Sequence, residues 1–231
     1  MAEKTAEKSQ KVLDALQESI SSFQKLLGTI NDDLTKQNVL RSMILFSCSG
    51  LDAIIKQLVI ETLESVIERD VETQKQLRSF AARQLRNNGD KYTVLAELIT
   101  AKNSRTLLIE MLKKNLTYNS LQSIDELRRV TGYFNIKLDT LIDKSNENVL
   151  DQAFRTRNEI VHQMDVKTEL KQLQYNIHGI DEVNGFYETI KAFACKFIEK
   201  VNEKLKGEVT EDYAPLFVVE DGVLMINCKD N

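Results

Sequence analysis

The chain has 231 residues, of which 29% are charged, one is proline and eight are glycine. This length suffices for a substantial hydrophobic core, and the scarcity of helix breakers favours long helices over many short strands. The net charge of −4 argues against a protein that coats nucleic acid non-specifically, because neutralising phosphates requires an excess of lysine and arginine. No apolar run approaches the roughly 20 residues that span a bilayer, and the N-terminus lacks a signal-peptide pattern. We therefore expect a cytoplasmic protein without a membrane segment.

The three cysteines, Cys48, Cys195 and Cys228, are odd in number and far apart. None belongs to a Cys-x-x-Cys pair, and no matching pair of histidines accompanies them, so neither a disulfide framework nor a zinc site is indicated. We expect buried free thiols, and neither a cofactor nor a metal ion.

Apolar residues recur at helical spacing along most of the chain. The pattern predicts a first helix over residues 12–30, a second and longer one over 40–66, and a last one over 183–205. Small residues at 47–50 lie in the middle of the second helix, where they lower helix propensity and allow a close approach of another helix or of a ligand. Close helix packing is the interpretation that we prefer.

The segment between these helices is predicted to be a helical insertion, at about residues 72–144, within one domain that spans residues 1–206. This middle part is less acidic than the rest, since residues 71–166 hold 15 basic and 12 acidic residues while the remainder holds 16 and 23. Its basic residues form either a groove that guides RNA or a set of solvated helix faces. Residues 207–231 form a tail in which an Asp-Gly turn predicts a β-hairpin. We also expect a short helical piece over residues 166–175.

One more helix, over residues 149–164, contains an unusual charged position. Leu150, Phe154, Arg157 and Val161 lie on one face of this helix, so Arg157 occupies an apolar stripe. A guanidinium there needs a carboxylate, a helix end or a bound phosphate, because an unpaired buried charge is strongly unfavourable. Ser145 or Asn146 is the predicted N-cap of this helix.

The same helix carries an Arg-Asn pair followed by a histidine, Arg157-Asn158-x-x-x-His162. Asn158 and His162 are one helical turn apart and lie within reach of one another. The pattern resembles the motif of the HEPN superfamily (higher eukaryotes and prokaryotes nucleotide-binding domains), and in particular its ribonuclease branch, RiboL-PSP-HEPN. Arg155 also satisfies the loose spacing, so the choice of Arg157 rests on the asparagine that follows it. The resemblance covers roughly residues 36–206.

A second correspondence lies in the helix over residues 41–59. It looks like the first core helix of the ribonuclease branch, in which an acidic residue near the middle, more often glutamate, faces the Arg/His motif; Asp52 occupies that position here. The resemblance implies an all-α fold, an HEPN-like helical bundle to which this chain adds the insertion and the C-terminal hairpin. It also implies a homodimer with a composite active site and RNA as the substrate.

These residues suit RNA cleavage without a metal, because RNA carries its own nucleophile in the ribose 2′-hydroxyl. A histidine can transfer protons at neutral pH, and an arginine matches the charge and shape of phosphoryl oxygens. The candidate catalytic residues are thus His162 and Arg157, with Asn158 orienting the histidine or the phosphate and Asp52 fixing Arg157. One histidine can hardly act as base and acid in the same displacement, which favours a two-fold dimer.

Two functional hypotheses remain at this stage. The first is a metal-independent endoribonuclease, acting as a toxin or antiphage defence effector and restrained by an inhibitory antitoxin or a sensor protein. The second is a non-catalytic HEPN-like module that binds a nucleotide or a protein partner. In a purely structural alternative, Arg157 pairs with Asp52 to hold two helices, and His162 is a polar residue near a helix end. His178, the only other histidine, is interpreted as a turn residue.

Overall fold

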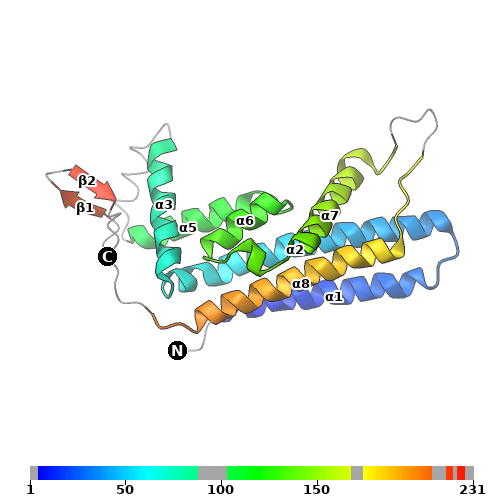
Figure 1. Cartoon of the computed structure of the whole chain (residues 1–231), viewed down its shortest axis with the longest axis horizontal. Helices are drawn as coiled ribbons and strands as arrows, with labels where there is room; N and C mark the ends of the chain where they lie inside the picture. Colours follow the sequence, from blue (N-terminus) through cyan, green and yellow to red (C-terminus); the bar gives the residue numbers. More distant parts are fainter. Residues whose placement is uncertain (1–4, 88–102, 168–173, 210–216, 221–222, 227–231) are drawn as a thin grey trace.

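The computed structural model describes residues 5–87, 103–167, 174–209, 217–220 and 223–226, and it is built almost entirely from helices (Figure 1). The elements in chain order are α1 (Glu7–Leu27), α2 (Asp33–Ile67), α3 (Val71–Asn87), α5 (Ser104–Tyr118), α6 (Ile124–Tyr133), the 3-10 turn η1 (Leu138–Thr140), α7 (Lys144–Gln163), α8 (Ile180–Leu205), β1 (Phe217–Glu220) and β2 (Val223–Ile226). The all-α bundle expected from the sequence is therefore confirmed.

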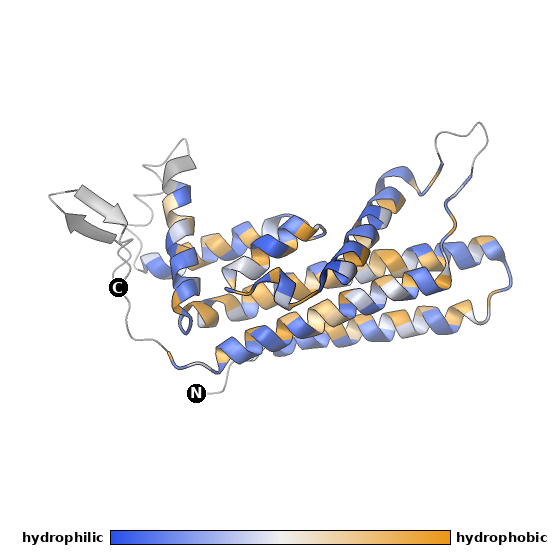
Figure 2. Ribbon diagram, in the orientation of Figure 1, coloured by the Kyte–Doolittle hydropathy of each residue, from blue (hydrophilic) through white to orange (hydrophobic). Residues whose placement is uncertain are grey.

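Helix α2 is the centre of the core. Helices α1 and α8 lie lengthwise beside it, and α5 and α7 pack against other parts of its surface (Figure 1). Because α2 has neighbours on several sides, it is the most continuously apolar helix, whereas α7 is hydrophilic along most of its length (Figure 2). By length and composition alone α2 could cross a membrane, contrary to the expectation from apolar runs, but half of its most apolar stretch is buried in the bundle. A core helix meets the same criteria.

The small residues in the middle of α2 permit close helix packing, as expected. A Cβ atom on Gly50 would lie 2.8 Å from both terminal methyl groups of Leu16 on α1. That distance is shorter than a van der Waals contact, so glycine lets α1 and α2 approach at this point.

The predicted insertion forms α3, α5, α6 and η1. Helices α5 and α6 lie along one side of α2, and α3 stands across the end of α2 (Figure 1). Side-chain caps begin two of these helices: Asn103 accepts a hydrogen bond from the N–H of Thr106, and Ser123 accepts one from that of Glu126. Residues 88–102 of the predicted insertion lie outside the described residues.

Helix α7 begins at Lys144, earlier than the sequence pattern indicated. Its N-cap is Asp143, whose Oδ1 accepts a hydrogen bond from the N–H of Asn146, so neither predicted cap is correct. An aspartate at this position also interacts favourably with the helix dipole. The two ends of the helical piece expected over residues 166–175 are not helical, because Val166 and Tyr175 form an antiparallel bridge; residues 168–173 lie outside the described part.

The C-terminal tail contains two short strands. Strands β1 and β2 pair antiparallel, with Phe217 opposite Ile226 and Glu220 opposite Val223. The Asp-Gly turn predicted between them falls outside the described residues.

Candidate functional site

Arg157 lies on the inner side of α7 and is half-buried. Its Nη1 donates a hydrogen bond of 2.9 Å to Oδ1 of Asn158, while its Nε is buried and has no hydrogen-bond partner among the described residues. The guanidinium is close enough to Cys48 on α2 to influence its ionisation: burial raises the pKa of the Cys48 thiol to about 12, and the positive charge of Arg157 opposes that rise. Cys48 also lies against α7 through a contact of 3.7 Å to the carbonyl oxygen of Ala153. Arg157 therefore reaches the α2 interface, and no carboxylate of the described residues pairs with it.

His162 and Asn158 lie on the outer side of α7, and both are exposed. Their spacing of four residues places them one turn apart on the same face, as expected. Arg157 is five residues from His162, which corresponds to a rotation of about 140° around the helix. Within one chain, the guanidinium thus points toward α2 while the imidazole projects into solvent from the last turn of α7.

Asp52 does not pair with Arg157, contrary to the expectation. Its Oδ1 accepts a hydrogen bond of 2.7 Å from the N–H of Leu121, and its Oδ2 forms an ion pair of 2.9 Å with Lys56. The carboxylate therefore holds the connection between α5 and α6 against α2. The physical reason is that a free backbone N–H in that connection needs an acceptor, and Asp52 lies next to it.

A second cluster of polar residues is more deeply buried than the motif. Asp165, two residues beyond α7, is fully buried and accepts hydrogen bonds from Nε of Arg41 at 2.6 Å and from Nδ2 of Asn176 at 2.9 Å. The Nε2 of His178 lies 2.8 Å from Oδ2 of the same carboxylate. Burial favours the neutral acid, but the hydrogen bonds from Arg41, Asn176 and His178 outweigh it and hold the pKa of Asp165 below its ordinary value. This buried cluster of Arg41, Asp165, Asn176 and His178 joins α2, the end of α7 and the start of α8.

His178 is therefore a buried member of this cluster and more than a turn residue. Only 7% of its surface is exposed. Its backbone is also fixed to α2, because its N–H donates to Oε1 of Gln37 at 2.9 Å and its carbonyl accepts from Nε2 of the same side chain at 3.0 Å.

The cysteines and the basic middle segment differ in part from expectation. Cys48 is a buried free thiol, but Cys195 is exposed, and Cys228 lies outside the described residues. Several basic side chains of the middle segment already have acidic neighbours: Arg128 pairs with Asp125 and Glu147, Arg129 with Glu126, and Lys113 with Glu64 and Glu110. These pairs favour solvated helix faces at those positions over a continuous cationic groove. Across the described segments, no group of three His, Cys, Asp or Glu side chains could hold a metal ion.

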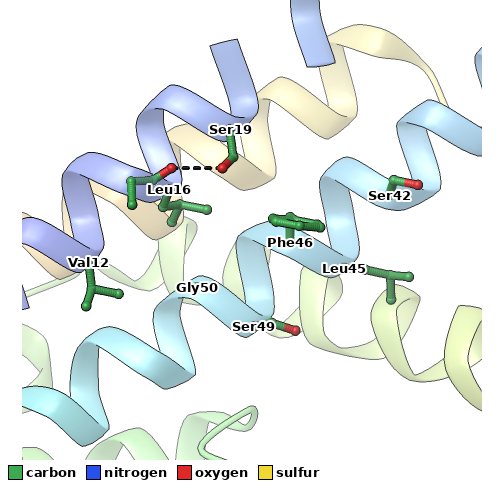
Figure 3. A pocket seen from close by; sticks show the side chains of 9 residues that line it. Val12, Leu16, Ser19, Ser42, Leu45, Phe46, Ser49 and Gly50 are labelled. Carbon is green, nitrogen blue, oxygen red and sulfur yellow. Dashed lines mark hydrogen bonds between the residues drawn. The ribbon is translucent and has the colours of Figure 1, made fainter. Parts of the chain in front are cut away.

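A groove of about 480 Å³ lies between α1 and α2 (Figure 3). Its walls are mainly apolar, with Phe46 half-exposed and Leu16 beneath Gly50. None of the residues that line it carries a titratable side chain; they are Val12, Ala15, Leu16, Ser19, Ser42, Leu45, Phe46, Ser49 and Gly50. It is therefore not a site of acid–base chemistry.

The fold is an all-helical bundle, and α7 carries Arg157, Asn158 and His162. This is the fold and the motif that the resemblance to the HEPN superfamily implied. The RiboL-PSP-HEPN family model matches residues 12–205, which is most of the sequence. The chain is thus a member of the RiboL-PSP-HEPN family, within the HEPN superfamily. No curated protein and no solved structure matches it.

Proposed function

We propose that this protein is a metal-independent endoribonuclease whose active site contains His162, Arg157 and Asn158. The observation that carries the proposal is that the Arg-Asn-x-x-x-His motif lies on α7, inside the matched family region, with its histidine exposed. An imidazole that is open to solvent is available for proton transfer to a substrate. We further propose that the enzyme acts as a toxin or an antiphage defence effector.

The proposed reaction uses the substrate's own hydroxyl. His162 removes the proton of a ribose 2′-hydroxyl, and the resulting oxygen attacks the adjacent phosphorus. The bond from phosphorus to the 5′-oxygen then breaks, and that oxygen receives a proton from a second acid. The products are a 2′,3′-cyclic phosphate and a 5′-hydroxyl. Arg157 stabilises the negative charge on the phosphoryl oxygens, because its guanidinium matches their charge and shape.

The second acid in this proposal is the partner subunit's His162 in a two-fold homodimer. One histidine per motif cannot hold the base and acid roles at once, and the rotation between Arg157 and His162 keeps them from converging within one chain. Apolar side chains around the end of α7 provide a surface for such a dimer. They are unusually exposed for their type: Val161 is 44%, Met164 72% and Ile177 82% exposed.

Purified protein incubated with total RNA in excess EDTA tests the reaction. The proposal predicts cleavage products with 2′,3′-cyclic phosphate or 3′-phosphate ends and 5′-hydroxyl ends, and no reaction when the 2′-hydroxyl at the cut site is replaced by hydrogen. Cleavage of DNA at a comparable rate would exclude this mechanism. RNA binding without cleavage would favour the nucleotide-binding module.

Light scattering tests the composite site. A homodimer at micromolar concentration is expected, with the end of α7 protected from hydrogen exchange. A monomer that still cleaves RNA, or a dimer that forms only through the C-terminal strands, would contradict a site shared between subunits.

A further inference from the structure

The end of α7 has an unusual backbone geometry next to His162. The helix ends at Gln163, and the next two residues, Met164 and Asp165, both have positive φ angles, of 53° and 58°. Neither is glycine, so both adopt a left-handed conformation that L-residues disfavour. The N–H of Asp165 also turns back to the carbonyl oxygen of Glu159, at 3.3 Å. Residues in such conformations persist only where the surrounding structure fixes them, and they concentrate at functional sites.

The buried cluster is what fixes this geometry. The carboxylate of Asp165 is tied to Arg41 on α2 and to His178 at the start of α8, and the N–H of Asn176 donates to the carbonyl oxygen of Asp165 at 2.9 Å. Asp165 thus has its side chain and its backbone carbonyl bonded to other parts of the protein. His162 lies only three residues earlier, in the last helical turn, which frays readily in a helix end without such an anchor.

We infer that Asp165, held by Arg41 and His178, is a positioning residue for His162. The cluster fixes the last turn of α7 to α2 and α8, so that the exposed imidazole is presented in one orientation to RNA and to the partner subunit. This inference rests on the proposed ribonuclease function for its catalytic consequence. Its structural part, the control of His162 by Asp165, stands independently.

The experiment measures the His162 ring directly. The chain contains two histidines, so a labelled sample gives two imidazole signals by NMR, and His162→Ala assigns them. In Asp165→Asn, a substitution that keeps the shape and tolerates positive φ, the His162 signal is expected to shift or broaden in the absence of RNA. The kcat for RNA cleavage should fall by about 10- to 100-fold with KM changed by less than about threefold, since misplacing a catalytic group affects mainly the chemical step.

Two further variants separate positioning from general stability. Asn176→Ala removes one neutral hydrogen-bond donor to Asp165, so an effect on His162 in this variant cannot arise from a lost charge. If Asp165→Asn does not fold, Asn176→Ala alone tests whether the cluster positions His162. Asp143→Ala is the matched control: it removes the cap at the opposite end of α7 and should lower Tm by about 2–4 °C without moving the His162 signal or kcat.

The outcomes for this inference and for the proposed function are distinct. A His162 signal that moves in Asp165→Asn and Asn176→Ala supports positioning even if wild-type protein cleaves no RNA, in which case only the ribonuclease proposal fails. A His162 signal that stays at its wild-type position in both variants overturns the inference. An active enzyme whose kcat in both variants matches that of Asp143→Ala also overturns it, while leaving the ribonuclease proposal intact.

Discussion

The buried ion pair between Arg41 and Asp165 should give strongly non-additive effects when its two charges are removed. The side chains are only 10% and 0% exposed, with Nε and Oδ2 2.6 Å apart. Asp165→Asn leaves the guanidinium buried without a counter-charge, which costs about 3–5 kcal/mol in the free energy of unfolding. For a domain of this size, that corresponds to a fall in Tm of about 6–20 °C. The double variant Arg41→Met/Asp165→Asn should instead lie within about 2 kcal/mol of wild type, because it removes both charges.

Urea unfolding at pH 7 of the wild type, both single variants and the double variant measures this coupling. The expected interaction energy is at least about 3 kcal/mol. Asp143→Asn is the control, because it makes the same chemical change at an exposed N-cap. Asparagine is an equally good cap, so only the interaction with the helix dipole is lost, about 0.3–1 kcal/mol. Additive effects, or an Asp165→Asn variant within about 1 kcal/mol of wild type, would refute a buried, coupled pair.

Three other predictions concern pH and individual side chains. The pKa of Asp165 is lowered in the folded state, so its contribution to stability is complete above the unfolded pKa near 4 and is lost as pH falls through the folded pKa. The free energy of unfolding of Asp165→Asn should therefore fall less than that of wild type between pH 4 and lower pH. An equal fall in both proteins would contradict the lowered pKa of Asp165. Asp52→Ala should cost about 1–3 kcal/mol by unfolding, because the N–H of Leu121 loses its acceptor; wild-type stability would show that contact to be dispensable. Arg155→Ala should reduce RNA cleavage less than Arg157→Ala does, since Arg155 is exposed and pairs with Asp151; the reverse order in a cleavage assay would reassign the motif arginine.

The helices were predictable because their apolar spacing reflects burial directly. The stripe in α8 gives Val183, Phe186, Ile190 and Phe193, all of which are buried. The predicted helix ends were less accurate: Asp143 caps α7, whereas Ser145 or Asn146 was the predicted cap. Local hydrogen bonding decides such caps, and several polar residues in a row leave the choice open.

The candidate motif could be recognised in the sequence because its residues are close together on one helix. The buried cluster was not found, because its members come from α2, the end of α7 and the start of α8, and only the fold brings them together. One signal was present: Arg41 lies seven residues before Cys48, so a charged residue shares the buried face of α2 and needs a partner. The same dependence on the fold explains why Asp52 contacts Leu121 and not Arg157.

The most direct test of the account is RNA cleavage by His162→Ala and Arg157→Ala in the presence of EDTA. Both variants should lose most activity, His162→Ala by about 10²- to 10⁴-fold, and the Tm of His162→Ala should match wild type because the side chain is exposed. Cleavage at the wild-type rate by both variants would contradict the ribonuclease proposal and leave the Arg-Asn-x-x-x-His pattern as part of the helical packing alone.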